Sequence, residues 1–138
     1  VVKWYRLWDK LNSISSKVFI EEDANTPFIV GALQTGKFNF LLVAPATANT
    51  VAKIVNGIAD TLITNAVSQT NKVNVDIFIL PVDQKRGITT STLPSGEKLE
   101  LTMRDIDVEN TSKLRKMKGI YVLERPEEIK TVVSRYIQ

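Results

Sequence analysis

Apolar residues along this chain form short continuous runs that alternate with stretches of helical spacing. These runs are Phe40–Ala44, Ile120–Leu123 and Val75–Leu80, the last of which contains one charged residue, Asp76. Runs of this kind are typical of strands buried on both faces of a parallel sheet. Helical spacing follows two of them, at Val51, Ile54, Val55 and Ile58 and at Ile129, Val132, Val133 and Tyr136. Strands that alternate with helices predict an α/β domain with a doubly wound parallel sheet.

The N-terminal segment predicts a helix followed by a short strand. Trp4, Leu7, Trp8 and Leu11 share one helical face. The two tryptophans could form a surface that stacks on the ring of a cofactor or contacts a partner, but aromatic residues in such positions most often belong to the core. The strand is expected at residues 17–20.

Two further helices are predicted nearer the middle and the end of the chain. One continues from Thr61 to Val67, after a break at Asn56-Gly57 that indicates a kink or two consecutive helices. The other runs to Met117, with Asp107 as its expected cap and Gly119 at its end.

Residues 87–93 and 98–104 predict a β-hairpin around the turn sequence Pro94-Ser95-Gly96-Glu97. Leu99, Leu101 and Met103 alternate with polar residues, so we expect one covered face. Three roles stay open for the hairpin: a flap over a substrate, a contact between subunits, and a simple edge of the fold.

The composition fits one globular domain that spans residues 1–138. With 138 residues, of which 43% are hydrophobic, the chain can bury a single core. It has no apolar run of membrane-spanning length and no signal peptide, so we expect a cytoplasmic protein outside the membrane. Its 18 basic and 15 acidic residues are spread along the whole chain, which argues against a nucleic-acid partner.

Histidine and cysteine are both missing from the chain. The usual proton carrier near neutral pH, the thiolate nucleophile and the commonest transition-metal ligands are therefore absent, and we predict neither a catalytic side chain nor a metal site. Gly31–Lys37 has the spacing of a phosphate-binding P-loop, but Phe38 replaces the Mg²⁺-binding hydroxyl and a strand-like run follows. Difficult chemistry would therefore need a bound organic cofactor.

The most informative stretch is Pro45-Ala46-Thr47-Ala48-Asn49-Thr50, between a predicted strand and a predicted helix. Pro45 is expected to stop the strand, and Asn49 or Thr50 to cap the helix. In open α/β sheets, ligands bind at this edge, because free N–H groups and the positive end of the helix dipole face the crevice there.

This hexapeptide, together with Lys53 and Asp60, resembles the PATANT-type signature of the FMN-binding, phosphopantothenoylcysteine decarboxylase-like flavoproteins. The segments 58–67, 80–83 and 105–110 look most like the archaeal flavoprotein group related to dihydromethanopterin reductase. The resemblance implies a three-layer α/β/α fold of the Rossmann or flavodoxin-like type with an added hairpin. It also implies an N-terminally incomplete domain, since a strand, a glycine-containing turn, a helix and a second strand come first in the family.

The same resemblance implies FMN as the cofactor. By that likeness, FMN is contacted by Thr47, Ala48, Asn49 and Thr50, with Val82 as a second edge. It further implies a homo-oligomer, a trimer or larger.

The leading functional hypothesis is an FMN oxidoreductase. It would pass electrons from ferredoxin to another flavoprotein or reduce a small-molecule substrate such as a pterin, with residues 83–86 orienting the substrate or recognising the redox partner. One alternative is an oligomeric flavin-binding module without turnover. Another is a decarboxylase of the same superfamily, which is disfavoured because Gly31 stands where those enzymes carry their active-site histidine and residues 81–86 replace their PxMNxxMW motif.

Overall fold

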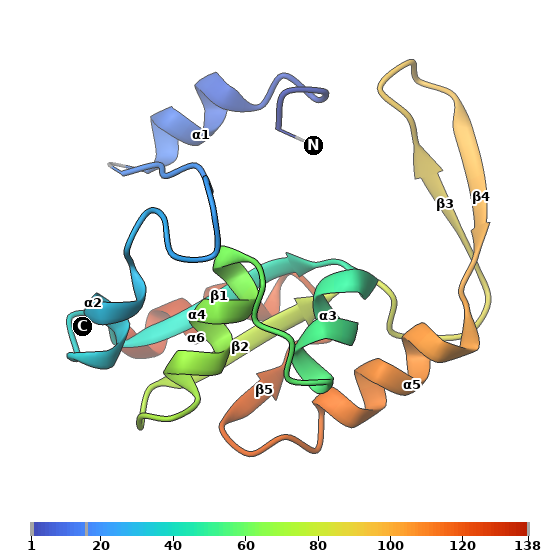
Figure 1. Cartoon of the computed structure of the whole chain (residues 1–138). Helices are drawn as coiled ribbons and strands as arrows, with labels where there is room; N and C mark the ends of the chain where they lie inside the picture. The colour runs from blue at the N-terminus through green and yellow to red at the C-terminus, as the bar shows by residue number, and fades with distance from the viewer. Residues whose placement is uncertain (1, 16, 138) are drawn as a thin grey trace.

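Three parallel strands form the central sheet, in the order β1–β2–β5 (Figure 1). The computed structural model describes residues 2–15 and 17–137 of the chain. The strands are β1 (Phe40–Ala46), β2 (Asp76–Pro81) and β5 (Ile120–Val122). Ile79 is aligned with Val43 on one side and with Val122 on the other. The carboxyl ends of all three strands therefore meet at one edge of the sheet.

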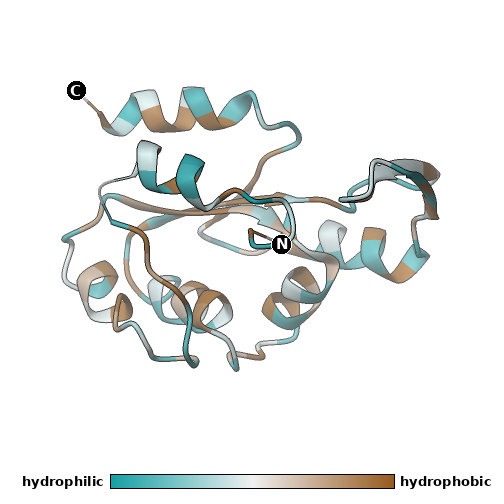
Figure 2. Ribbon diagram, turned by 90° about the horizontal axis from the view of Figure 1, so that it is seen from above, coloured by the Kyte–Doolittle hydropathy of each residue, from teal (hydrophilic) through white to brown (hydrophobic). Residues whose placement is uncertain are grey.

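Helices cover both faces of this sheet, which confirms the predicted three-layer α/β/α architecture (Figure 2). One face carries α2 (Val30–Gln34), α3 (Ala48–Val55), α4 (Leu62–Thr70) and α5 (Asp105–Leu114). The opposite face carries α6 (Glu128–Tyr136). None of the helices in the described residues has both the length and the apolar character needed to cross a membrane.

Successive residues of β2 alternate between two parts of the core. Ile77 and Ile79 are fully buried with residues of α3, α4 and α5, whereas Phe78 and Leu80 pack with α6. Because both faces of the strand are covered, every position from 77 to 80 is apolar. Full burial of one such side chain contributes about 1.5–3 kcal/mol.

α3 and α4 are two consecutive helices separated by a break that includes Asn56-Gly57. This is one of the two predicted alternatives, the other being a kink. Gly57 adopts a positive φ of 73°, which ends the first helix without the strain that a side chain would add. Thr61 then caps α4 in a reciprocal box with Thr64, in which each side chain bonds to the backbone N–H of the other.

Two predicted boundaries were wrong. Pro45 does not stop β1, which continues to Ala46 through an irregularity in the register after Val43. Asp107 does not cap α5, because the helix begins at Asp105 with Arg104 in the capping position, and it ends at Leu114. Asp107 is instead buried inside the first turn, where its carboxylate binds the guanidinium of Arg104.

The N-terminal segment does not enter the core. α1 (Trp8–Ile14) contains no buried residue, and Trp4 is 75% exposed. The prediction that these aromatic residues are core was therefore wrong. Trp4 and Leu7 precede the helix, which begins at Trp8, so the four apolar residues do not form one helical face, and Trp8 is also exposed. Residues 17–20 were predicted as a strand and pair with no other strand.

The predicted hairpin is present as β3 (Ile88–Thr92) and β4 (Lys98–Thr102), which pair antiparallel. It projects from the body of the molecule (Figure 1). The expected covered face is not covered within the described chain, since Leu99 and Leu101 are 42% and 40% exposed. The hydroxyl of Tyr5 donates a hydrogen bond to the carbonyl oxygen of Thr92, at 3.0 Å, and so links the N-terminal segment to the hairpin.

Candidate functional site

The turn after β1 is held by a threonine cap. Thr47 has an extended backbone, and its hydroxyl oxygen accepts the backbone N–H of Thr50 at 3.3 Å. α3 therefore starts at Ala48, and the prediction of Asn49 or Thr50 as the cap was wrong. The first amides of a helix have no partner within the helix. Those of Ala48 and Asn49 also donate to no other group in the described part of the chain, so both are available to a ligand.

The end of β2 lies directly beside this turn. The backbone N–H of Val82 donates to the carbonyl oxygen of Ala46, at 3.0 Å. The side chain of Val82 is 54% exposed, although the preceding residues of the strand are buried. Two parts of the predicted site that are far apart in the sequence, the Thr47–Thr50 turn and Val82, thus meet at the carboxyl edge of the sheet.

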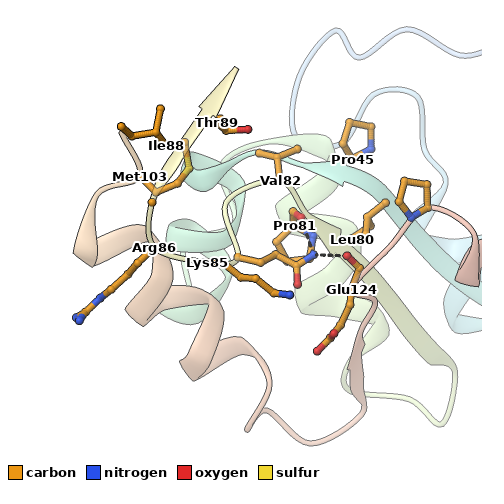
Figure 3. Close-up of a pocket in the computed structure, with 13 residues that line it drawn as sticks. Pro45, Leu80, Pro81, Val82, Lys85, Arg86, Ile88, Thr89, Met103 and Glu124 are labelled. Carbon is orange, nitrogen blue, oxygen red and sulfur yellow. Dashed lines mark hydrogen bonds between the residues drawn. The ribbon is translucent and has the colours of Figure 1, made fainter. Parts of the chain in front are cut away.

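A cavity of about 530 Å³ opens beside Val82 (Figure 3). Its floor is formed by the ends of β1 and β2, and its far wall is the base of the hairpin. Most of its lining is apolar, with contributions from Pro45, Leu80, Pro81, Val82, Ile88 and Met103. Its size lies in the range of small-molecule sites. Of the five predicted contact residues, Val82 lines this cavity, whereas Thr47, Ala48, Asn49 and Thr50 lie next to it, beyond Ala46.

Sequence reasoning offered a flap over a substrate as one of three roles of the hairpin, but it did not identify the hairpin base or the segment after β5 as walls of the cavity. Ile88, Thr89 and Met103 come from the two ends of the hairpin, and Glu124 and Pro126 follow β5. The available signal was the position of the hairpin, which begins only a few residues after β2 and returns to the same place. Which side of the sheet edge it would border depends on tertiary packing and had no counterpart in the sequence.

Gln84 fixes the loop that leaves β2. Its side-chain amide donates to the carbonyl oxygens of Pro81 and Leu123, each at 2.9 Å, and lies 3.4 Å from that of Glu124. Its oxygen accepts a hydrogen bond of 2.8 Å from Arg115 in α5. Every polar atom of this side chain is engaged within the protein, so Gln84 holds the loop and is not free to orient a substrate.

Asp83 is also held by the protein through its backbone. Its backbone carbonyl accepts the hydroxyl of Thr111 at 3.0 Å. Burial raises the pKa of its carboxyl above the ordinary value, with a smaller contribution from the nearby Asp107 carboxylate, while the Arg104 guanidinium acts in the opposite direction. Arg104 itself forms a two-bond pair with Asp107, at 2.8 Å for each bond.

The two cations that follow Gln84 differ in their surroundings. Arg86 pairs with Asp105 at 2.9 Å, and Figure 3 shows its side chain directed away from Val82 and Pro45. Lys85 lines the cavity and forms no ion pair with any described residue. Among Gln84, Lys85 and Arg86, which line the cavity, Lys85 is therefore the one whose side chain remains available to a ligand. No group of three or more histidine, cysteine, aspartate or glutamate side chains that could hold a metal ion occurs in the described residues.

Comparison with known proteins decides the family. The family model described as Flavoprotein matches residues 3–136. The chain belongs to the Flavoprotein family. A relative from Methanocaldococcus jannaschii, named "Uncharacterized protein MJ0730", is 54% identical over 138 residues, which cover all of this chain and 74% of that protein. From the same organism, a protein named dihydromethanopterin reductase (acceptor) is 33% identical over 188 aligned positions, covering 94% of this chain and 76% of its own length.

Solved structures of this Flavoprotein fold support the same conclusion. Burkholderia xenovorans DmrB in its apo form superposes with a TM-score of 0.74 at 27% identity, and the match covers 94% of this chain and 68% of DmrB. DmrB in complex with FMN gives a TM-score of 0.67 at 30% identity, covering 78% of this chain and 59% of that one. It is described as a cubic protein cage for redox transfer. These matches confirm the predicted fold class and the predicted family.

Proposed function

We propose that this member of the Flavoprotein family is an FMN-binding redox protein. The observation that carries the proposal is the family match over residues 3–136, which includes the turn at the ligand-binding edge of the sheet. A solved relative, DmrB, is described with FMN bound and as a cage for redox transfer. The chain has no histidine and no cysteine, and bound FMN would supply the hydride or electron transfer that its own side chains cannot.

The residues at the turn fit a flavin. We infer that Thr47, Ala48, Asn49, Thr50 and Val82 contact the cofactor. The free amides of Ala48 and Asn49, at the positive end of α3, favour a ligand edge that carries negative charge. The methyl side chain of Ala48 permits close approach of the backbone, and the exposed surface of Val82 supplies an apolar contact.

An FMN titration of the intact protein, followed by flavin fluorescence and visible absorption, tests the cofactor proposal. We expect saturable binding, and we expect Thr47→Ala to weaken it about two- to tenfold, because a hydrogen bond is worth about 0.5–1.5 kcal/mol. Thr61→Ala is the matched control, since Thr61 caps α4 in the same way outside the predicted contacts. A protein that takes up no FMN, or equal losses of affinity in the two variants, contradicts the proposal.

The electron acceptor is a second question. Relatives from Methanocaldococcus jannaschii and Methanosarcina mazei are named dihydromethanopterin reductase (acceptor), so we propose reduction of a pterin as the first reaction to examine. Electron transfer from ferredoxin to another flavoprotein is the other. Chemically reduced, FMN-loaded protein would be mixed anaerobically with dihydromethanopterin or with an oxidised flavoprotein. Reoxidation identifies the acceptor class, whereas a flavin that no acceptor reoxidises indicates a binding module without turnover.

We also propose that the chain forms a homo-oligomer. Large apolar side chains are exposed on α1 and on the hairpin, and the relative DmrB is described as a cubic cage. Mass measurement by light scattering at micromolar concentration tests this, and a monomeric mass contradicts it. A cytoplasmic location stays a prediction from the sequence.

A further inference from the structure

The charges of the side chains that line the cavity beside Val82 do not cancel. Three of these side chains are charged: Lys85, Arg86 and Glu124. Arg86 is paired with Asp105 at 2.9 Å, and Glu124 lies 3.6 Å from Arg115. Lys85 has no carboxylate partner within the described chain. Once the paired groups are set aside, the cavity keeps one uncompensated positive charge.

The backbone that carries Lys85 is fixed from several directions. The preceding residue, Gln84, is bonded to the ends of β2 and β5 and to α5. On the other side, Arg86 is tied to Asp105, and the carbonyl oxygen of Gly87 accepts the backbone N–H of Met103 at 2.9 Å. Lys85 therefore lies on an ordered loop. When its side chain binds a ligand, less backbone entropy is lost than if the loop were mobile before binding.

The rest of the lining is apolar. Leu80, Val82, Ile88 and Met103 line the same space, and the Thr47–Thr50 turn lies next to it, beyond Ala46. Figure 3 shows the Lys85 side chain extending beneath Pro81, on the side of Glu124, while Val82 and Pro45 lie above. An apolar space with one cation at its margin complements a molecule that has an apolar body and one negative charge.

We propose that this cavity binds a small organic anion with an apolar body and that Lys85 binds its negative charge. The inference names the ligand class for the cavity next to the proposed flavin contacts, and in that respect it rests on the proposed function. FMN also carries a negative group, its phosphate, so the shared chemistry is an anion at Lys85. The test must tell the phosphate of the cofactor from a second molecule.

Benzoate and benzamide are suitable probes, because they have nearly the same shape and differ in charge. Their binding to the FMN-loaded protein is measured by perturbation of the flavin absorption, and to the flavin-free protein by ligand-observed NMR. We expect benzoate to bind about fivefold more tightly than benzamide at low ionic strength, and the preference to shrink in 0.5 M salt. Lys85→Met should abolish the preference without changing benzamide binding.

Lys118→Met is the matched control. Lys118 is an exposed lysine at the opposite edge of the sheet that also lacks an ion pair in the described structure, so its removal changes the net charge equally. The preference for benzoate should survive in this variant. Equal affinities for the two probes in the unmodified protein, or the same loss in both lysine variants, overturn the proposal.

The phosphate is tested separately by comparing FMN with riboflavin. If Lys85→Met weakens FMN binding but not riboflavin binding, Lys85 holds the cofactor phosphate, and the proposal of a second anion is overturned. Unchanged FMN-to-riboflavin ratios together with loss of the benzoate preference support it. If the protein binds no FMN but keeps a Lys85-dependent preference for benzoate, only the proposed function is contradicted. If the protein binds FMN but shows no such preference, only this inference is overturned.

Discussion

Tyr136 ties the C-terminal helix to the first residue of β2. Its hydroxyl donates a hydrogen bond of 2.5 Å to a carboxylate oxygen of Asp76. This bond, with burial as a second cause, raises the pKa of Tyr136 to about 12 from its ordinary value of 10.0. The ring also lies 4.7 Å from Phe40 and 6.2 Å from Phe78, so one side chain joins α6 to two strands.

The raised pKa predicts a loss of stability at high pH. Below pH 10 the phenol is protonated in both the folded and unfolded states, and its contribution is complete. Between about pH 10 and 12 the unfolded chain loses the proton while the folded chain retains it, so the free energy of unfolding falls as the pH rises. We expect this loss to be about 1–2 kcal/mol, below the full value of the shift because the pair lies near solvent.

Urea unfolding at intervals from pH 9 to 12 measures this effect. Tyr136→Phe should be less stable than the unmodified protein at pH 9 and should lose the extra slope. Tyr121→Phe serves as the control, since Tyr121 stacks on Phe78 at 5.2 Å and is 51% exposed, with no carboxylate bonded to it in the described structure. Parallel pH profiles for all three proteins would show that the Asp76 bond contributes nothing.

Single-residue roles at the cavity were the least accessible to sequence reasoning. The sequence places Gln84 and Lys85 side by side after a buried strand, and both were candidates for substrate contact. The structure separates them, because the amide of Gln84 is satisfied by the ends of β2 and β5 and by Arg115, which are close only after folding. Likewise, Asn49 and Thr50 were the predicted caps, but the extended backbone of Thr47 and its bond to the N–H of Thr50 place Thr47 in that position.

Elements whose partners are close in sequence, or which are buried on all sides, were predicted well. The runs that became β1, β2 and β5, the amphipathic pattern of α6 and the hairpin were read from local periodicity alone. The apolar face of the hairpin shows the limit of such reasoning. Alternation of Leu99 and Leu101 with polar residues indicates that something covers the face, but it does not indicate which molecule, and in the described chain the face is open.

Because the hairpin face is open, we expect the double variant Leu99→Ser with Leu101→Ser to change the oligomeric state without changing the stability of the single chain. Because neither side chain is buried, the free energy of unfolding of the single chain should change by no more than about 0.5 kcal/mol. The mass measured by light scattering should fall if this face joins subunits. Glu100→Ser, on the opposite face of the same strand, is the control and should leave the mass unchanged. A loss of about 2–5 kcal/mol in a monomeric preparation would instead mean that the chain covers these residues itself.

At the scale of the whole molecule, the relatives are longer than this chain. The match to the reductase from Methanocaldococcus jannaschii extends over 188 aligned positions, whereas the chain has 138 residues. That relative therefore contains residues inside the matched region that have no counterpart here. That the domain is N-terminally incomplete stays a prediction. The fold class was accessible from the sequence because the strand and helix signals repeat in an order that few topologies satisfy, whereas the placement of residues 2–20 was not.

Ligand linkage gives a test at this scale. If FMN binds the folded chain and not the unfolded one, FMN at 100 times its Kd should raise the free energy of unfolding by about 2.7 kcal/mol. The thermal midpoint should rise with FMN concentration without reaching a plateau. FAD at the same concentrations is the control for non-specific effects of a flavin, because it carries the same ring system as FMN but is larger by an adenosine monophosphate group. A midpoint that is independent of FMN would contradict the cofactor proposal.

The cavity beside Val82 takes its floor and its opposite wall from different parts of the chain. The floor belongs to the strand ends next to the Thr47–Thr50 turn, whereas the opposite wall comes from one uninterrupted segment, the loop after β2 and the hairpin base. Exchange of that segment would change the wall of the cavity and leave the Thr47–Thr50 turn in place. The size and lining of the space beside Val82 can therefore be changed by substitutions within residues 84–103 alone.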